Sequence, residues 1–290
     1  MTRGFLIFAH NNEQIDYTLI ALCNALMIRA NSNHPNVTLV TNQGSHDWLR
    51  KQQGDLVDQA FDQIIIQKTP ESGPRRFQDT ASTTHTLKWH NGTRASAYDL
   101  TPYDETILLD ADYLIMDRTL DHAWGSNNGF MMNRDVTTLE HLPPSEQEVR
   151  LEPFGVPLYW ATCVYFRRCE DARQMFEIIS HVRENYDYYQ HLYRFPGSLF
   201  RNDYAFSIAA HLLGGWTEGA VPSLPAPTLL TSFDSDELES VPGRNQLTFL
   251  VADTERRGSF KLNRVSGISV HVMNKFSIVR HAPAILEAYR

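Results

Sequence analysis

The chain has 290 residues, of which 42% are hydrophobic, and its 26 Lys and Arg against 34 Asp and Glu give a net charge of −8. This is the composition of a globular protein with enough apolar residues for a large core, and it excludes a basic coat of the kind that binds nucleic acid or anionic membranes. The longest purely apolar runs, such as 64–66, are far shorter than the ~18 residues that a membrane-spanning helix needs, so we expect no membrane insertion. The opening residues lack a signal-peptide pattern, and the three cysteines are sparse, so we expect a cytoplasmic protein with reduced thiols.

The first part of the chain alternates strands and helices. Compact apolar runs predict strands over 4–9, 37–40, 61–66 and 106–109, and apolar residues at helical spacing predict helices over 15–30, 46–53 and 83–100. This order indicates a mainly parallel α/β sheet. In such a sheet ligands bind beyond the carboxyl ends of the strands, which places His10, Asn11, Thr41, Asn42 and the segment 110–112 along one edge.

The second part is less regular. Its patterns predict strands over 129–132, 159–166 and 247–251, helices over 171–191 and 202–213, and long loops over 142–157 and 222–242. We expect one domain, 1–290, with an α/β half over 1–117 and an α+β half over 118–290.

Two carboxylates follow the strand predicted at 106–109. Residues 101–200 carry eight basic and sixteen acidic residues, and within this acidic stretch Asp110 and Asp112 are separated by one small residue, so an extended backbone turns both to the same side. Two like charges at that distance need a counter-charge, and a divalent cation is the usual one. The alternative is a surface turn, where Asp is common for backbone reasons.

The stretch 88–117, ending in Leu109-Asp110-Ala111-Asp112, resembles the nucleotide-diphosphosugar transferases of the GT-A fold, whose signature is a strand ending in Leu-Asp-x-Asp. Similarity extends in order to 8–12, 40–42, 159–168, 201–203 and the pair His271 and Lys275. The pattern is similar to compact bacterial and bacteriophage members that are distantly glycogenin-like. It implies a GT-A (Rossmann-like) fold, with a mixed, mainly parallel central sheet flanked by helices and an α+β acceptor-side half. The implied activity is metal-dependent transfer of a hexose or pentose from a nucleoside-diphosphate sugar to a hydroxyl group.

The resemblance implies a metal site. Asp112 would bind Mn²⁺ or Mg²⁺, Asp110 would contact the metal or the ribose, and His271 would be a third ligand, which favours Mn²⁺ because Mg²⁺ prefers oxygen ligands. The alternative for His271 is a partly buried histidine at a strand end. Glycogenin-type relatives carry His-x-x-Gly-x-x-Lys, whereas Lys275 here follows His271 at a shorter spacing.

Further roles follow from the same resemblance. Asp203 would act as general base in an inverting enzyme or position the acceptor in a retaining one, and its alternative is a helix N-cap. Basic side chains would contact the diphosphate, and the alternative is that they are ordinary solvated charges on a helix. Polar side chains would hold the nucleoside, although residues of these types are equally common in turns and helix caps. The residues implied in nucleotide-sugar binding are Ala9, His10, Asn11, Thr41, Asn42, Lys88, Arg94, Asp110, Ala111 and Lys275.

Other functions remain open. A haloacid-dehalogenase-like phosphohydrolase also uses Asp-x-Asp, but after its first strand, and sugar-nucleotide pyrophosphorylases open with a Gly-rich loop that residues 9–12 do not match. A catalytically inactive sugar-nucleotide-binding protein is the non-enzyme alternative. The acceptor is open between a glycan, a small molecule, a protein and a hydroxymethylated base of phage DNA. For DNA the sequence offers basic residues near aromatic ones: Arg75, Arg76, Lys88, Arg94, Arg167, Arg168, Phe77, Trp89 and Phe166. The donor sugar, the stereochemistry and the oligomeric state do not follow from the sequence.

Overall fold

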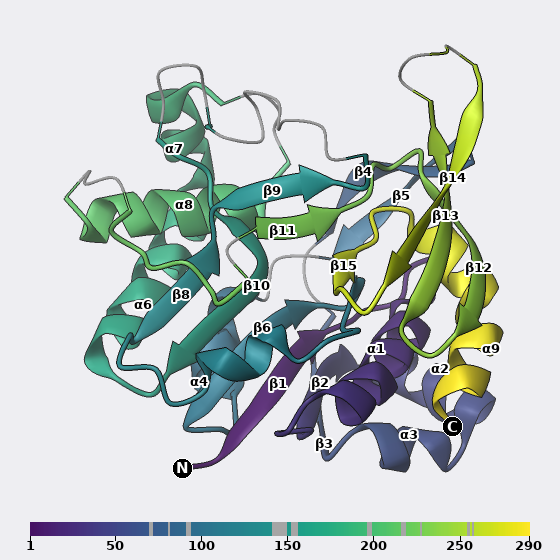
Figure 1. Cartoon of the computed structure of the whole chain (residues 1–290). Helices are drawn as coiled ribbons and strands as arrows, with labels where there is room; N and C mark the ends of the chain where they lie inside the picture. Colours follow the sequence, from purple (N-terminus) through teal and green to yellow (C-terminus); the bar gives the residue numbers. More distant parts are fainter. Residues whose placement is uncertain are drawn as a thin grey trace.

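The computed structural model describes residues 1–69, 72–80, 82–90, 94–140, 150–151, 156–195, 199–215, 219–226, 228–253, 256 and 258–290. Its centre is a sheet in the order β3-β2-β1-β6-β10-β8, in which β10 alone runs antiparallel to its neighbours (Figure 1). These strands are β1 (Arg3–Phe8), β2 (Val37–Asn42), β3 (Gln63–Gln67), β6 (Glu105–Asp110), β8 (Phe130–Asn133) and β10 (Trp160–Arg167). The predicted fold class, a mixed, mainly parallel sheet flanked by helices, is confirmed. Strands from both predicted halves of the chain share this sheet.

The sheet brings the carboxyl ends of its central strands to one edge. β2 is buried throughout, and β1 and β6 are buried except at their ends, which explains their continuous apolar runs. Phe8 pairs with Val40 on one side and with Asp110 on the other, so the loops after β1, β2 and β6 begin at the same level. A ligand site is expected at this edge.

The described helices flank the central sheet, with α1 packed against α9 and α6 against α8. Asp16, Asn42 and Asn274 precede α1, α2 and α9, and each accepts a hydrogen bond from a backbone N–H of the first helical turn. In the described part of the chain, no helix has the length and apolar character needed to cross a membrane. The helices are α1 (Tyr17–Asn31), α2 (Gln43–Gln53), α3 (Leu56–Ala60), α4 (Ala97–Leu100), α6 (Glu170–Glu184), α7 (Tyr186–Tyr193), α8 (Asn202–Leu213) and α9 (Lys275–Tyr289), with 3₁₀ turns η1 (Arg94–Ser96) and η2 (Thr119–Ala123).

The expectation of a helix over 83–100 is wrong. Residues 72–90 form an antiparallel hairpin of β4 (Ser72–Thr80) and β5 (Thr83–His90), and helical structure begins only at Arg94. The threonines at 83, 84 and 86 and Trp89 favour a strand, which the spacing of apolar residues concealed. Most of β5 is exposed or half-buried, so no clean apolar alternation marks it.

The remaining strands build two smaller sheets beside the central one. The order β7-β15-β11-β9 forms one, and β12-β13-β14 forms the other. Part of the loop expected over 222–242 is therefore strand, and Pro242 is tolerated because β12 is an edge strand. The bounds are β7 (Tyr113–Leu114), β9 (Asp135–Thr138), β11 (Thr228–Thr231), β12 (Glu237–Gly243), β13 (Gln246–Ala252), β14 (Phe260–Ser266) and β15 (Val270–His271).

Two other expectations need comment. The single helix expected over 171–191 is two helices, because the backbone leaves helical geometry at Asn185. The loop expected over 142–157 lies mostly outside the described residues.

Candidate metal and nucleotide site

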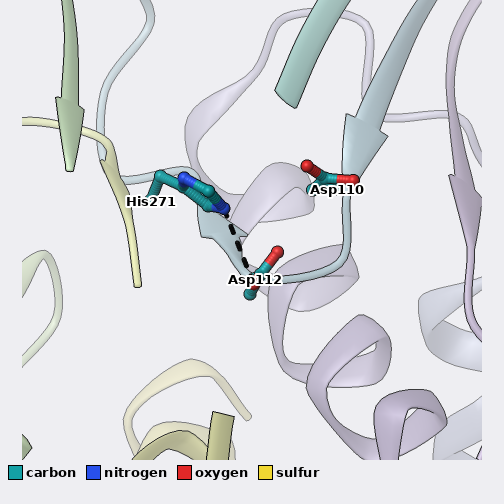
Figure 2. Close-up of side chains that lie close together, drawn as sticks. All are labelled: Asp110, Asp112 and His271. Atoms are coloured by element: carbon teal, nitrogen blue, oxygen red, sulfur yellow. Dashed lines mark ion pairs between the residues drawn. The ribbon is translucent and has the colours of Figure 1, made fainter. Parts of the chain in front are cut away.

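Asp110 and Asp112 lie at the carboxyl end of β6, in the middle of the central sheet. Asp110 is the last residue of the strand, and Asp112 precedes the short strand β7. The two carboxylates and the His271 imidazole each offer one ligand atom within 4.8 Å of the others (Figure 2). The sequence prediction that these three side chains meet therefore matches the geometry.

His271 reaches this place through strand pairing. β15 pairs antiparallel with β7 and sets His271 opposite Tyr113, and the Val272 N–H donates to the Asp112 carbonyl over 2.9 Å. The His271 Nε2 lies 3.6 Å from Asp112 Oδ2, and Nδ1 lies 3.4 Å from the Thr231 hydroxyl. The hydroxyl and the carboxylate together hold the ring in the orientation of a ligand.

Two cations of the chain itself contact the carboxylates. Lys275, the first residue of α9, places Nζ 2.7 Å from Asp112 Oδ2, and Arg94 forms an ion pair with Asp110. Burial by itself would raise the pKa of Asp112, but Lys275 and His271 outweigh it and hold that pKa well below its ordinary range. Burial raises the pKa of Asp110, Arg94 opposes the rise, and Asp112 adds to it.

The donor set fits a divalent cation. Two carboxylates and one imidazole are side chains that commonly bind divalent metals in proteins. Lys275 occupies one oxygen of Asp112, so a cation bound there has to share that carboxylate or displace the ammonium group. The repulsion between the two aspartates does not itself require a metal, because Lys275 and Arg94 already balance it.

A cleft over this cluster holds buried polar atoms that lack partners among the described residues. Arg94 is 4% exposed, yet its Nε and Nη2 have no hydrogen-bond partner. Both ring nitrogens of His10 and the hydroxyl of Tyr17 are unsatisfied in the same way, and all three side chains line the cleft. Such atoms are costly to bury without a partner, so a polar ligand is expected between them.

Among the residues expected to hold the nucleoside, which follow β1 or end β2, His10 lines the cleft. Burial, with a smaller effect of His90, lowers the pKa of His10 to about 4, so its ring is neutral at neutral pH. Asn11 accepts from the Thr18 N–H, and Asn42 caps α2. These two asparagines therefore act as turn and cap residues, which was the alternative to nucleoside binding.

The other predicted nucleotide-binding residues divide in the same way. Ala111 lines the cleft beside the aspartates, whereas Ala9 and Thr41 are buried at the ends of their strands. Lys88 is 67% exposed and lies 3.7 Å from Glu13. The helix expected to carry Lys88 toward the diphosphate is absent, because residues 83–90 are strand.

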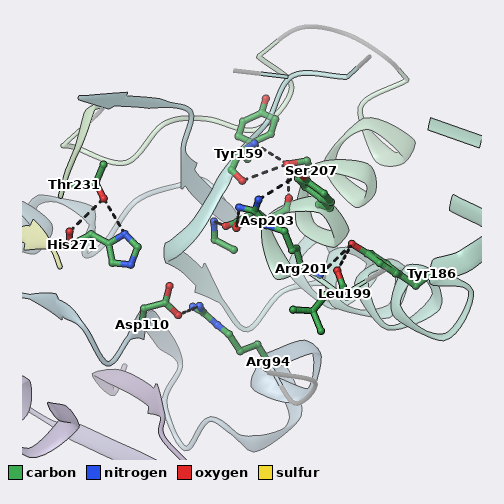
Figure 3. A network of polar contacts seen from close by, with 12 residues as sticks. Arg94, Asp110, Tyr159, Tyr186, Leu199, Arg201, Asp203, Ser207, Thr231 and His271 are labelled. Atoms are coloured by element: carbon green, nitrogen blue, oxygen red, sulfur yellow. Dashed lines mark hydrogen bonds and ion pairs between the residues drawn. The ribbon is translucent and has the colours of Figure 1, made fainter. Parts of the chain in front are cut away.

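Asp203 lines the same cleft (Figure 3). It is in the first turn of α8, but its side chain does not cap the helix. Instead, Oδ1 accepts from the Ala161 N–H at 3.0 Å and Oδ2 accepts from Arg201 at 3.1 Å. The N-cap alternative is thus wrong, and the carboxylate joins α8 to the start of β10.

Sequence reasoning missed much of the rest of the lining. Trp160 and Thr162 come from β10, Trp89 and His90 come from β5, which was expected to be helical, and Arg75 comes from β4, for which no element was expected. The alternation of threonines with larger side chains in 83–90 was the available indication for the hairpin.

The basic residues considered for DNA do not form one patch. Arg75 lines the cleft, whereas Arg167, on β10, lies beside Glu105 in the strand register, at the end of β6 opposite Asp110. Arg168 donates to the carbonyls of Thr101 and Tyr103. The second pair of arginines therefore lies away from the Asp110 edge.

No protein-family model matches the chain, and no curated protein matches its sequence. Among solved structures, the glycosyltransferase GlyE of Streptococcus pneumoniae TIGR4 aligns with 13% identity and a TM-score of 0.44, covering 78% of this chain and 46% of that one. The galactosyltransferase LgtC, solved with donor and acceptor sugar analogs, has 13% identity and a TM-score of 0.44, over 75% of this chain and 72% of the other. Mouse xyloside xylosyltransferase 1 has 12% identity and a TM-score of 0.44, over 74% and 83%.

The chain spans about half of the GlyE chain that it matches. All three neighbours are glycosyltransferases, but with TM-scores below 0.5 the likenesses carry no argument about what this chain does. Its function has to be inferred from its own side chains.

Proposed function

We propose that this chain is a metal-dependent glycosyltransferase that uses a nucleoside-diphosphate sugar. The observation that supports it most is the combination, in one cleft, of the Asp110, Asp112 and His271 cluster with the unpartnered nitrogens of Arg94. The cluster suits a divalent cation, and the guanidinium suits phosphate oxygens. A metal-bound diphosphate satisfies both.

The residues have complementary tasks in this proposal. Asp110, Asp112 and His271 would hold Mn²⁺, or else Mg²⁺, which would supply positive charge to the leaving diphosphate. Lys275 and Arg94, which contact the same carboxylates, would donate to phosphate oxygens. The neutral ring of His10 provides one donor and one acceptor for the nucleoside.

Transfer makes one bond and breaks another. The acceptor hydroxyl oxygen bonds to the anomeric carbon, the bond from that carbon to the diphosphate oxygen breaks, and its electron pair leaves with the nucleoside diphosphate. The hydroxyl proton has to be removed. Asp203 takes it in an inverting enzyme, whereas in a retaining enzyme the leaving diphosphate oxygen takes it and Asp203, held by Ala161 and Arg201, positions the acceptor.

The acceptor stays a matter for experiment. A glycan or small-molecule hydroxyl fits the proposal, and a hydroxymethylated DNA base is an acceptor that would have to use Arg75 and Arg76 without help from Arg167. DNA binding through these residues predicts a steep salt dependence that an Arg75 and Arg76 double substitution flattens.

A thermal-shift screen of nucleoside-diphosphate sugars with and without Mn²⁺ or Mg²⁺ tests the proposal, because a ligand of the folded state raises the melting temperature. The expected result is a metal-dependent shift with one nucleotide family that Asp112→Asn abolishes and Asp47→Asn, at an exposed carboxylate, retains. No shift with any donor in the presence of metal would contradict the proposal. Release of phosphate from phosphomonoesters would then favour a phosphohydrolase, and a shift without turnover would favour a binding protein.

A further inference from the structure

The β4–β5 hairpin forms one wall of the cleft. It stands apart from the central sheet and is held by contacts with other segments (Figure 1). At one end, Asp79 pairs with Arg280, and its carbonyl accepts from Asn274 over 2.9 Å, both from the α9 region. Toward the other end, the Lys88 carbonyl accepts from Asn12 over 2.9 Å. A Cβ on Gly73 would lie 2.7 Å from Leu199, so the backbone there passes close to the segment that leads into α8. These contacts fix the hairpin as a wall of the cleft.

Arg75 projects from this wall and is held by aromatic rings. Its guanidinium lies 4.5 Å from the ring centroid of Trp89 and 5.5 Å from that of Phe77, on the same face of the hairpin. Stacking on flat rings orients a guanidinium while leaving its N–H groups free in the ring plane. Arg76, the next residue, is exposed and on the opposite face.

Arg75 differs from the other cations that line the cleft. Arg94 pairs with Asp110, Lys275 with Asp112 and Arg201 with Asp203. For Arg75, neither an ion pair nor a hydrogen bond is found within the described residues. Its donors are therefore available to a ligand.

The charge of the cleft indicates an anion. The Arg and Lys side chains that line the cleft outnumber its carboxylates by one, and Arg75 is the one without a carboxylate partner among the described residues. A bound divalent cation would add to this excess of positive charge. Arg75 also lies on the side of the aspartates: burial raises the pKa of Tyr17, and the charges close enough to modify that pKa are those of Asp112, Arg75 and Asp110. A ligand between these groups meets the arginine and the metal cluster together.

We propose that Arg75 binds the diphosphate of the sugar donor from the hairpin wall of the cleft, and that Trp89 positions it. This inference rests on the proposed function. Planar guanidinium groups form paired hydrogen bonds with phosphate oxygens, and negative charge on the diphosphate grows as the sugar leaves.

The test is a calorimetric titration of ADP, GDP, CDP, UDP and dTDP in the presence of Mn²⁺ or Mg²⁺, followed by the tightest of these with each variant. Arg75→Ala is expected to weaken binding by about 10- to 100-fold, as the loss of charge-assisted hydrogen bonds implies. Arg75→Lys should lie between wild type and Arg75→Ala, because it keeps the charge but loses the fork and the stack. Arg76→Ala, which removes the same charge from the outer face, should bind within about twofold of wild type.

Thermal unfolding shows whether each variant is folded. If Arg75→Ala is not, Arg75→Gln keeps most of the side chain against Trp89 without the charge, and the same loss is expected of it. Binding within twofold of wild type in the folded variant, together with loss of binding in Asp112→Asn, would overturn the role of Arg75 and leave the proposed function standing. A wild-type protein that binds none of the five nucleotides with either metal would overturn both.

Discussion

Lys275→Met tests whether the Lys275 ammonium group and a divalent metal compete for Asp112. The ammonium group and the carboxylate are 9% and 8% exposed and lie 2.7 Å apart, while His271 is 3.6 Å from the same oxygen. Methionine keeps the length of the side chain but removes the charge, so Asp112 is left buried with His271 as its remaining partner. Removing one member of a buried ion pair costs about 3–5 kcal/mol, and we expect the lower end because the His271 Nε2, 3.6 Å from the same oxygen, stays beside Asp112.

A divalent cation should reverse this loss. In the wild-type protein the metal has to share Asp112 with Lys275 or displace it, and in Lys275→Met it does not. The variant should therefore be destabilised by about 3 kcal/mol in EDTA, and it should gain more stability from Mn²⁺ than the wild type does. Urea unfolding curves with EDTA and with Mn²⁺ measure both effects.

Lys88→Met is the matched control, since Lys88 is 67% exposed and its partner Glu13 is 50% exposed. It should leave both unfolding curves unchanged, because exposed ion pairs contribute little. The reasoning fails if Lys275→Met unfolds in EDTA at the same urea concentration as Lys88→Met. It also fails if Mn²⁺ stabilises Lys275→Met no more than the wild type.

Three further expectations concern stability. Burial raises the pKa of Asp236 from 3.8 to about 6 against an opposing backbone hydrogen bond, so the folded state binds the proton more tightly and loses stability as the pH rises through this interval. Asp236→Asn should add at most about 3 kcal/mol to the free energy of unfolding at pH 7 and nothing near pH 4, as measured by urea unfolding. Burial, with a neighbouring histidine, lowers the pKa of His10 from 6.5 to about 4, so the unfolded chain binds the proton at a higher pH than the folded protein does. The free energy of unfolding should therefore fall as the pH drops through that interval. His10→Gln should reduce the fall, and an unchanged pH profile would refute the assignment. Gly4→Ala places a Cβ 2.3 Å from the buried ring of Tyr103 and should cost about 1–3 kcal/mol. Gly44→Ala places its Cβ 3.7 Å from the Asn42 side chain, without a clash, and should stabilise its helix by about 0.5–1 kcal/mol. Equal melting temperatures of the two variants would contradict this.

The central sheet and its carboxylate pair could be predicted because their residues are buried in continuous runs. Residues 106–109 have the apolar pattern of a central parallel strand, which places Asp110 at its end; the chain then turns at Ala111 and Asp112 rather than staying extended, and the two carboxylates still meet. The place of His271 depends on the pairing of β15 with β7, which no local pattern reveals. Only the resemblance to a known family selected it from the histidines of the chain.

The β4–β5 hairpin shows where sequence reasoning failed. Its strands are held by contacts with residues far along the chain, such as Asp79 with Arg280, rather than by a buried face of their own. The apolar spacing of 83–100 was therefore misinterpreted as a helix, and Arg75 was considered for DNA phosphates rather than for the cleft. The ion pair of Lys275 with Asp112 was also beyond reach, because it depends on where α9 begins in space.

The most direct test of the account is metal-dependent release of nucleoside diphosphate from the donor that the thermal-shift screen selects. The wild-type protein and Asp47→Asn should release it only with Mn²⁺ or Mg²⁺, and Asp112→Asn should lose the reaction at every donor concentration. Full metal-dependent release by Asp112→Asn would contradict the assignment of Asp112 as a ligand of the catalytic metal.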